Sequence, residues 1–247
     1  GAWLTQRGPA IASLSFAELQ RYDVGRLRPG TPYAARYPDQ QGADGVRIPR
    51  LDQLFALVER SGNSEVRFNI ETKISPLAPH ETLPPRPFAA RLVEEIRKAG
   101  LTRRATVQSF DWRTLVEVQR IAPEIATVYL TAEQPWQDNI RRSAIEGSPW
   151  TAGFRFRDSG SVPRMIKLAG GGIWSPYFGD VNEAVISEAH ALGLKVVVWT
   201  VNKPEDLRRM LALKVDGIIS DRPDLVRTEM EAAGLKVPQP TPVAWRD

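Results

Sequence analysis

Three polar residues at alternate positions of one short segment, Asn69, Glu71 and Lys73, are the clearest chemical feature of the sequence. They overlap the run at residues 66–71, which predicts a β-strand, and alternate side chains of a strand point to the same face. A carboxylate and an ammonium are costly to bury on one face unless they have a partner, a metal ion or an anion. The pair is therefore either an internal Glu–Lys ion pair or part of a site for a charged ligand.

Other polar and aromatic residues stand where further predicted strands end. The strand at 106–110 ends in Gln108-Ser109-Phe110, where polar side chains contact a ligand or Ser109 only forms a turn beside a helix cap. Trp199 lies at the end of a strand at 195–201, where it forms either an apolar wall for a small polyol or part of a packed core. Asp221 follows the last strand, and we expect it to cap the next helix. Parallel β/α folds place their sites at these carboxyl ends.

The elements that must position these residues alternate along the chain from residue 66 onward. Six strands are predicted at 66–71, 106–110, 125–130, 172–175, 195–201 and 217–220, with a doubtful seventh at 152–156. Helices are predicted between them at 88–99, 112–122, 135–145, 162–169 and 182–192, and after Pro204 and Pro223. Strict alternation predicts parallel strands with crossover helices, as in a doubly wound sheet or a (β/α)8 barrel.

The segment before residue 66 predicts two helices separated by a loop at 25–49. Ser15 and Glu18 form a capping box for the first helix, and Pro49 precedes the second. The stretch 74–87 contains five prolines, so we expect a stiff loop without helix. Prolines 238, 240 and 242 predict an extended tail at 237–247, after one domain at 1–236.

Composition excludes several classes of site. The 247 residues contain no cysteine, which excludes disulfides, thiolate zinc sites and cysteine nucleophiles, and only His80 and His190 as histidines. The net charge of +4 is small and scattered, so no nucleic-acid partner is expected. The longest apolar runs have strand length and predict no transmembrane segment. No signal-peptide pattern is present, which leaves periplasmic, secreted and cytoplasmic locations open.

Four segments together resemble the glycerophosphodiester phosphodiesterase family. They are FNIETK at 68–73, VQSFD at 107–111, VVVWTVN at 196–202 and DGIISDRPD at 216–224. The resemblance extends from about residue 10 to residue 230. It implies a TIM-like barrel that hydrolyses small-molecule glycerophosphodiesters to glycerol 3-phosphate and an alcohol with a divalent cation, Ca²⁺ or Mg²⁺.

The resemblance also implies roles for individual residues. Glu71 matches a metal-ligand glutamate, and Lys73 matches a lysine that contacts phosphate. Trp199 matches a tryptophan near the glycerol end of the substrate, and Gln108 is expected to face the substrate at the mouth. Carboxylate oxygens suit a hard dication, and an ammonium helps to neutralise a phosphodiester and its transition state.

The sequence departs from the family at its amino-terminal motifs. The His-Arg, Glu-x-Asp and His-Asp elements that supply the acid–base histidines and further metal ligands are absent, and neither His80 nor His190 matches them. Since the chain also starts with Gly1, we interpret it as the carboxy-terminal part of a family member, an incomplete (β/α)8 barrel without its first two strands. The open edges at 66–71 and 217–220 then predict self-association.

We therefore expect little or no phosphodiesterase activity from this chain alone. One alternative is a barrel that binds a phosphoester without cleaving it. Another is a Schiff-base lyase that uses Lys73, although the adjacent Glu71 favours the ammonium over the nucleophilic amine.

Overall fold

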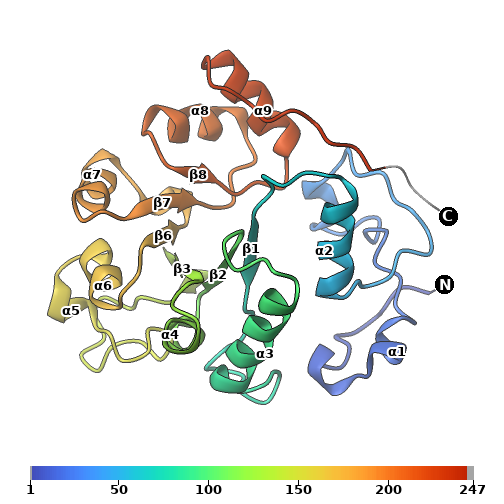
Figure 1. Cartoon of the computed structure of the whole chain (residues 1–247), viewed down its shortest axis with the longest axis horizontal. Helices are drawn as coiled ribbons and strands as arrows, with labels where there is room; N and C mark the ends of the chain where they lie inside the picture. Colours follow the sequence, from blue (N-terminus) through green and yellow to red (C-terminus); the bar gives the residue numbers. More distant parts are fainter. Residues whose placement is uncertain (1, 244–247) are drawn as a thin grey trace.

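The computed structural model describes residues 2–243 and shows an α/β fold built on a curled parallel sheet, a half-barrel surrounded by helices (Figure 1). The strand order is β1-β2-β3-β6-β7-β8. These strands are β1 (Phe68–Glu71), β2 (Ala105–Ser109), β3 (Ala126–Thr131), β6 (Ile173–Pro176), β7 (Lys195–Val198) and β8 (Gly217–Ile218). The sequence order of the strands is also their spatial order, as the prediction of an incomplete TIM-like barrel requires.

Helices connect the strands and cover the outside of the sheet (Figure 1). The α-helices of the described chain are α1 (Phe16–Leu19), α2 (Leu51–Arg60), α3 (Pro85–Lys98), α4 (Trp112–Ile121), α5 (Phe156–Ser159), α6 (Val162–Leu168), α7 (Glu183–Ala191), α8 (Pro204–Ala212) and α9 (Pro223–Ala232). Short 3-10 turns lie at Ile11–Ser13, Ala34–Arg36 and Phe178–Asp180. The capping box of Ser15 and Glu18 at α1 is present as predicted.

The sheet has an outer face, which the helices cover, and an inner face. Successive side chains along each strand point alternately to these two faces. Phe68 points outward, where its ring lies 5.0 Å from that of Phe55 on α2 at 76°. Glu71 has the opposite orientation and is paired in register with Gln108 of β2. The predicted parity of β1 is therefore confirmed.

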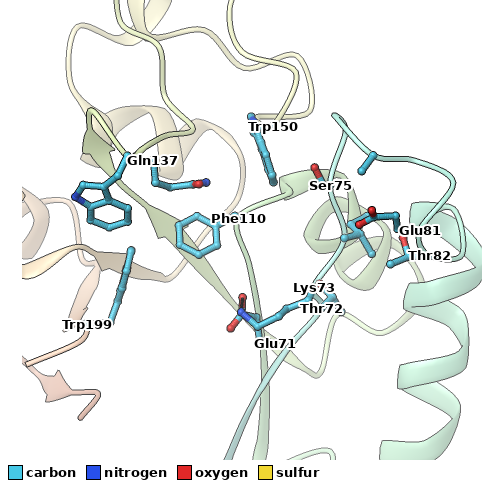
Figure 2. Close-up of a pocket in the computed structure, with 13 residues that line it drawn as sticks. Glu71, Thr72, Lys73, Ser75, Glu81, Thr82, Phe110, Gln137, Trp150 and Trp199 are labelled. Atoms are coloured by element: carbon cyan, nitrogen blue, oxygen red, sulfur yellow. Dashed lines mark hydrogen bonds and ion pairs between the residues drawn. The ribbon is translucent and has the colours of Figure 1, made fainter. Parts of the chain in front are cut away.

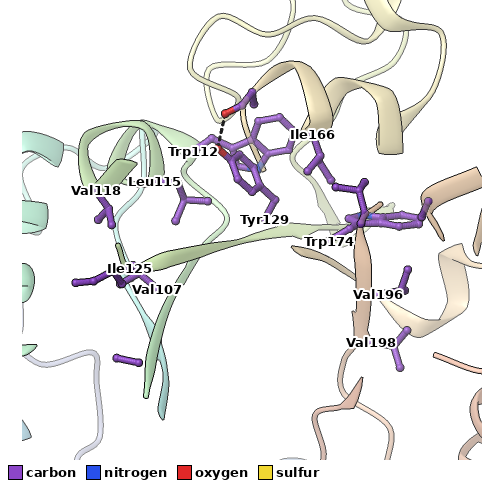
Figure 3. Close-up of a cluster of buried hydrophobic side chains, with 14 of the residues drawn as sticks. Val107, Trp112, Leu115, Val118, Ile125, Tyr129, Ile166, Trp174, Val196 and Val198 are labelled. Atoms are coloured by element: carbon purple, nitrogen blue, oxygen red, sulfur yellow. Dashed lines mark hydrogen bonds between the residues drawn. The ribbon is translucent and has the colours of Figure 1, made fainter. Parts of the chain in front are cut away.

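The main hydrophobic core lies between the outer face and the helices (Figure 3). Trp112 of α4 and Tyr129 of β3 are fully buried, with ring centroids 4.9 Å apart at 83°. The Tyr129 hydroxyl donates to the Ala169 carbonyl oxygen at 2.9 Å, and the Trp174 indole donates to Thr131 Oγ1 at 2.9 Å. The large aromatic rings are thus buried with their polar atoms satisfied.

Strands β1 and β8 are the two ends of this sheet and do not pair with each other. Between residues 2 and 243, no further strand adds to either edge. The segment before α2 lies to one side of the half-barrel, and it contacts the β8 end where the Tyr37 hydroxyl donates to Asp221 at 3.0 Å (Figure 1). The half-barrel therefore keeps two open strand edges.

The predicted helix at 135–145 is wrong. Glu133–Gln134 and Gln137–Asp138 form the antiparallel hairpin β4–β5, and turns follow. Buried Asn139 holds this hairpin, because its side chain accepts from the Ala132 amide at 2.9 Å and donates to the Leu130 carbonyl at 3.0 Å. A side chain that bonds the backbone in this way competes with helix formation.

The predicted strand at 152–156 is also wrong. Ala152 and Gly153 have φ values of 54° and 90°, in the left-handed region that extended strands do not use. The chain turns there and enters the short helix α5 instead.

The expectation that 74–87 excludes helix is wrong at its end, because α3 begins at Pro85. Pro85 and Pro87 occupy the first turn, where the missing amide hydrogens have no intrahelical acceptor to lose. The remaining prolines of the stretch lie in loop.

The division into a domain at 1–236 and a tail at 237–247 stays a prediction. Residues 237–243 have no helix or strand, while 244–247 lie outside the described residues. The Pro238 carbonyl accepts from Arg227 Nη2 at 2.7 Å. The described residues form no helix that has both the length and the apolar character needed to span a bilayer.

Candidate functional site

A cavity of about 370 Å³ opens at the carboxyl ends of the strands, within the usual range for small-molecule sites (Figure 2). The side chains that line it come from the end of β1, from the loops after β1, β2 and β7, and from the β4–β5 hairpin and the segment that follows it. They are Glu71, Thr72, Lys73, Ile74, Ser75, Ala78, Glu81, Thr82, Phe110, Trp136, Gln137, Trp150 and Trp199. Glu71, Lys73 and Trp199, which are separated in the sequence, therefore line one pocket.

Glu71 and Lys73 form an ion pair at the base of this pocket, with Lys73 Nζ 2.9 Å from Glu71 Oε1. The Glu71 side chain is 22% exposed, whereas that of Lys73 is 79% exposed. The pair predicted as one interpretation of the sequence is thus present. Since the ammonium remains open to solvent, an anion can also reach it.

The backbone beyond β1 is held in place, which positions Lys73. The Thr72 amide donates to the Gln108 carbonyl at 2.9 Å, and the Ser109 hydroxyl donates to the Thr72 carbonyl at 2.8 Å. The Thr72 side chain is buried and bonds that of Thr114 on α4 at 2.7 Å. These bonds extend the parallel pairing of β1 with β2 past the end of the strand.

Trp199 continues the inner face of β7, as the sequence position predicts. Its indole donates to the Ser175 carbonyl at 3.0 Å, and its backbone forms a bridge with Tyr177. The ring packs edge-to-face with Phe110, with centroids 5.2 Å apart. Trp199 is half-buried and lines the pocket, and its ring packs against Phe110 as the core interpretation predicts; contact with a polyol stays a prediction.

Gln108 lies next to Glu71 but is not among the residues that line the cavity. Its amide oxygen accepts from Asn69 Nδ2 at 2.6 Å, and Asn69 Oδ1 accepts from the Thr106 hydroxyl at 2.8 Å. Gln108 is 8% exposed. The structure therefore places it in a polar row beside the carboxylate.

Asp221 does not cap α9, so this prediction is wrong. The N-cap residue is Arg222, and it makes no side-chain cap bond. Asp221 instead accepts hydrogen bonds from Tyr37 and from Asn202 Nδ2. The bond with the Asp221 carboxylate raises the pKa of Tyr37 to about 12.

The two histidines lie outside the pocket lining. His190 Nε2 is 2.9 Å from Asp216 Oδ2, at the amino end of β8, and His80 is exposed in the loop before α3. The predicted surface and helix-packing roles agree with these positions.

The residues of the pocket do not form a divalent-cation site. Across residues 2–243, no three His, Cys, Asp or Glu side chains come together in a way that could hold a metal ion. Glu71 is bonded to Lys73, and the second carboxylate, Glu81, accepts from Arg7 Nη2 at 2.6 Å. Ca²⁺ takes six to eight oxygen ligands, which this donor set does not supply.

Sequence reasoning did not find most of the aromatic lining. Phe110 follows β2, Trp136 lies at the hairpin turn and Trp150 precedes the left-handed turn. The sequence contains a partial signal for this aromatic lining, because Trp136 and Trp150 lie in polar, turn-rich segments where a large aromatic residue is unusual. Their convergence depends on loops that the pattern did not predict.

The sequence model of the glycerophosphoryl diester phosphodiesterase family matches residues 3–225. A glycerophosphodiester phosphodiesterase of Caldanaerobacter subterraneus is 24% identical over 217 residues, which cover 87% of this chain and 70% of the relative.

Solved structures share the fold. A crystal structure from Silicibacter pomeroyi that bears the same family name has a TM-score of 0.81 and 33% identity, and the match covers 95% of this chain and 74% of that one. A phosphodiesterase from Oleispira antarctica, in complex with its product sn-glycerol-3-phosphate, has a TM-score of 0.52 and 18% identity. The match covers 75% of this chain and 62% of that one. The chain therefore belongs to the glycerophosphodiester phosphodiesterase family.

Proposed function

We propose that the pocket binds the glycerol phosphate part of a glycerophosphodiester. The observation that carries this proposal is the convergence of Glu71, Lys73 and Trp199 on one cavity at the carboxyl ends of the strands. The exposed Lys73 ammonium offers a charge-assisted hydrogen bond to a phosphate oxygen. The Oleispira antarctica protein, which shares the fold, binds sn-glycerol-3-phosphate.

Each residue has an assigned part in this proposal. Lys73 binds the phosphate, and the Trp199 ring contacts the carbon side of the glycerol. Gln108 supports the site beside Glu71, where its hydrogen bond with Asn69 fixes the amide. Glu71 forms an ion pair with Lys73 and competes with the phosphate for its ammonium, and it is the carboxylate of this pocket that would contribute to holding a Ca²⁺ or Mg²⁺ ion.

We further propose that this chain alone hydrolyses the bound diester weakly or not at all. Hydrolysis requires a base for the attacking water and an acid for the leaving alcohol, and histidine usually serves these roles. His80 and His190 lie outside the pocket lining, and the donor set does not fit a dication. Binding without turnover is therefore the function that the pocket supports.

Calorimetric titration with sn-glycerol 3-phosphate tests the binding. We expect Lys73→Met to weaken affinity about tenfold, because one charged hydrogen bond is lost, while Lys98→Met on the exposed face of α3 serves as the control. Equal affinity in the wild type and Lys73→Met would contradict the assignment of Lys73.

The proposal of weak or absent hydrolysis is tested by measuring the release of glycerol 3-phosphate from a glycerophosphodiester, with Ca²⁺ and with Mg²⁺. We expect no release above a protein-free blank. Cation-dependent release by this 247-residue chain would show that other residues supply the acid and base.

The Schiff-base lyase receives no support from the geometry. Lys73 Nζ is held by Glu71 Oε1 at 2.9 Å, whereas imine formation requires a free amine that is directed at a carbonyl carbon. Borohydride reduction with a carbonyl compound is expected to leave Lys73 unmodified, as judged by mass spectrometry.

A further inference from the structure

Gln108 is held on the inner face of β2 by only one end of its side-chain amide. Its Oε1 accepts a hydrogen bond from Asn69 Nδ2 at 2.6 Å, and Asn69 Oδ1 accepts one from the Thr106 hydroxyl at 2.8 Å. Because Asn69 receives the Thr106 proton on its oxygen, it presents its nitrogen, which only donates, to Gln108. These two bonds therefore fix the orientation of the Gln108 amide and leave its two N–H donors on the side away from Asn69.

The geometry does not favour the opposite direction of this hydrogen-bonded row. If both amides were turned over, Asn69 would donate to Thr106, and the Thr106 proton would have to go to the Phe68 carbonyl oxygen at 3.4 Å. That distance is too long for an ordinary O–H···O bond, whereas the 2.8 Å between Thr106 and Asn69 is normal. The orientation of Gln108 thus follows from the position of the Thr106 hydroxyl.

The Gln108 nitrogen has no partner but still reaches accessible space. Across residues 2–243 it makes no hydrogen bond to a protein group, and the residue as a whole is 8% exposed. In the same part of the chain, no fully buried side-chain nitrogen or oxygen lacks a partner, so this nitrogen keeps some accessible surface. Its donors are available to an acceptor that comes close on the inner face.

Glu71 is the neighbouring acceptor. Glu71 and Gln108 are paired in register on adjacent parallel strands, and both side chains point to the inner face. Glu71 Oε1 bonds Lys73 at 2.9 Å, while no bond within the described chain engages the second carboxylate oxygen. Since the Glu71 side chain is only 22% exposed, water would compensate it incompletely if Lys73 moved away.

We propose that Gln108 is a positioning residue, which donates to the Glu71 carboxylate when a phosphate draws the Lys73 ammonium away from it. The proposal rests on the proposed function, because it takes the phosphate to bind Lys73. Without a second donor, phosphate binding would leave a partly buried carboxylate without its partner, at a cost in affinity. Gln108 reduces this cost, and Asn69 keeps its nitrogen unoccupied for the purpose.

Removal of the Lys73 ammonium imitates its departure and tests the proposal without a ligand. Nuclear magnetic resonance follows the side-chain amide protons of Gln108. In Lys73→Met, we expect one of these protons to shift downfield, because it then donates to the Glu71 carboxylate. The double variant Lys73→Met/Glu71→Met, which has no carboxylate to receive the bond, should lack this shift. Identical Gln108 signals in the single and the double variant would overturn the proposal.

Calorimetric titration with sn-glycerol 3-phosphate in a chelating buffer tests the role of Gln108 in binding. We expect Gln108→Met to weaken the affinity roughly three- to tenfold, because a donor to a charged group is lost. In the Glu71→Gln background the same substitution should change the affinity less than twofold, since no carboxylate needs a donor there. Gln40→Met, in the exposed loop before α2 and outside the pocket lining, is the matched control.

The outcomes separate this proposal from the function on which it rests. If the wild type binds sn-glycerol 3-phosphate and Gln108→Met weakens binding equally in both backgrounds, Gln108 is only a structural residue. That result overturns the proposal and leaves the proposed function standing. If the wild type does not bind the ligand, the phosphate site is overturned, and a downfield Gln108 proton in Lys73→Met still supports the bond from Gln108 to Glu71.

Discussion

At the scale of single residues, the proposed phosphate site depends on the ion pair between Glu71 and Lys73. The carboxylate is 2.9 Å from the ammonium, so a phosphate that binds Lys73 must share it with Glu71. The partial exposure of Glu71 keeps this competition moderate, because water screens the pair. The Glu71 carboxylate would favour the binding of a cation and disfavour the binding of an anion without a cation.

Glu71→Gln is therefore expected to raise metal-free affinity for sn-glycerol 3-phosphate about two- to fivefold, because it removes a like charge beside the phosphate. Titration in a chelating buffer measures this change. Glu94→Gln, on the exposed face of α3, is the control that changes net charge equally. Weaker binding by Glu71→Gln would show that the carboxylate orients Lys73 more than it competes with phosphate.

Tyr129 makes the free energy of unfolding depend on pH above about pH 10. Burial raises the pKa of its phenol from 10.0 to about 12, because the phenolate is poorly solvated in the core. The folded pKa is above the unfolded one, so this stabilisation is fully present below pH 10 and is lost as the pH rises through about 12.

Tyr129→Phe is expected to remove this part of the pH dependence, which is on the order of 1 kcal/mol between pH 9 and pH 11. Urea unfolding at pH 9 and at pH 11 measures it, with the wild type losing more stability between the two than the variant. Parallel losses in both proteins would place the titrating group elsewhere.

At the scale of elements, the β4–β5 hairpin depends on one buried amide. Asn139 is fully buried, and besides its bonds to Ala132 and Leu130 it donates to the Phe110 carbonyl at 3.2 Å. It therefore joins the hairpin that carries Trp136 to the loop that carries Phe110.

Asn139→Ala is expected to lower the free energy of unfolding by roughly 2–4 kcal/mol, because several backbone groups lose their partner. The measurement is urea unfolding followed by tryptophan fluorescence. Ile145→Ala, an exposed position in the same segment, should change stability by less than about 0.5 kcal/mol. A small effect of Asn139→Ala would mean that water replaces the amide.

The regular elements were predictable because each has a local signal. Strand β7 is a run of β-branched residues, and α8 and α9 each begin with a proline. Asp111 caps α4 by accepting a hydrogen bond from the Arg113 amide. All these signals act within a few residues. The segment between β3 and α6 was not predictable in this way. Its shape depends on a buried amide that reaches Phe110 and on left-handed residues at Ala152 and Gly153.

At the scale of the whole molecule, the half-barrel ends in strands β1 and β8, whose outer edges carry no further strand within residues 2–243. Unpaired edges expose backbone donors and acceptors that another chain can satisfy. The inner face adds apolar surface at Val197 of β7 and at Ile219, which continues β8. We therefore propose that the chain self-associates through these edges.

Sedimentation velocity at increasing concentration is expected to show this association. Ile219→Lys, which puts a charge at the β8 edge, should abolish it, whereas Leu168→Lys on the exposed side of α6 should not. A concentration-independent monomer in the wild type would contradict the proposal.

The sequence by itself determined the α/β alternation, the parity of β1 and the family, because strand periodicity and four short motifs are local properties of the chain. It also indicated that Glu71, Lys73 and Trp199 belong to one site, since parallel strands bring their carboxyl ends together. Only the tertiary structure decided what surrounds them. Phe110, Trp136 and Trp150 come from three separate loops, and long-range bonds such as those of Asn139, rather than local preference, bring them to one pocket.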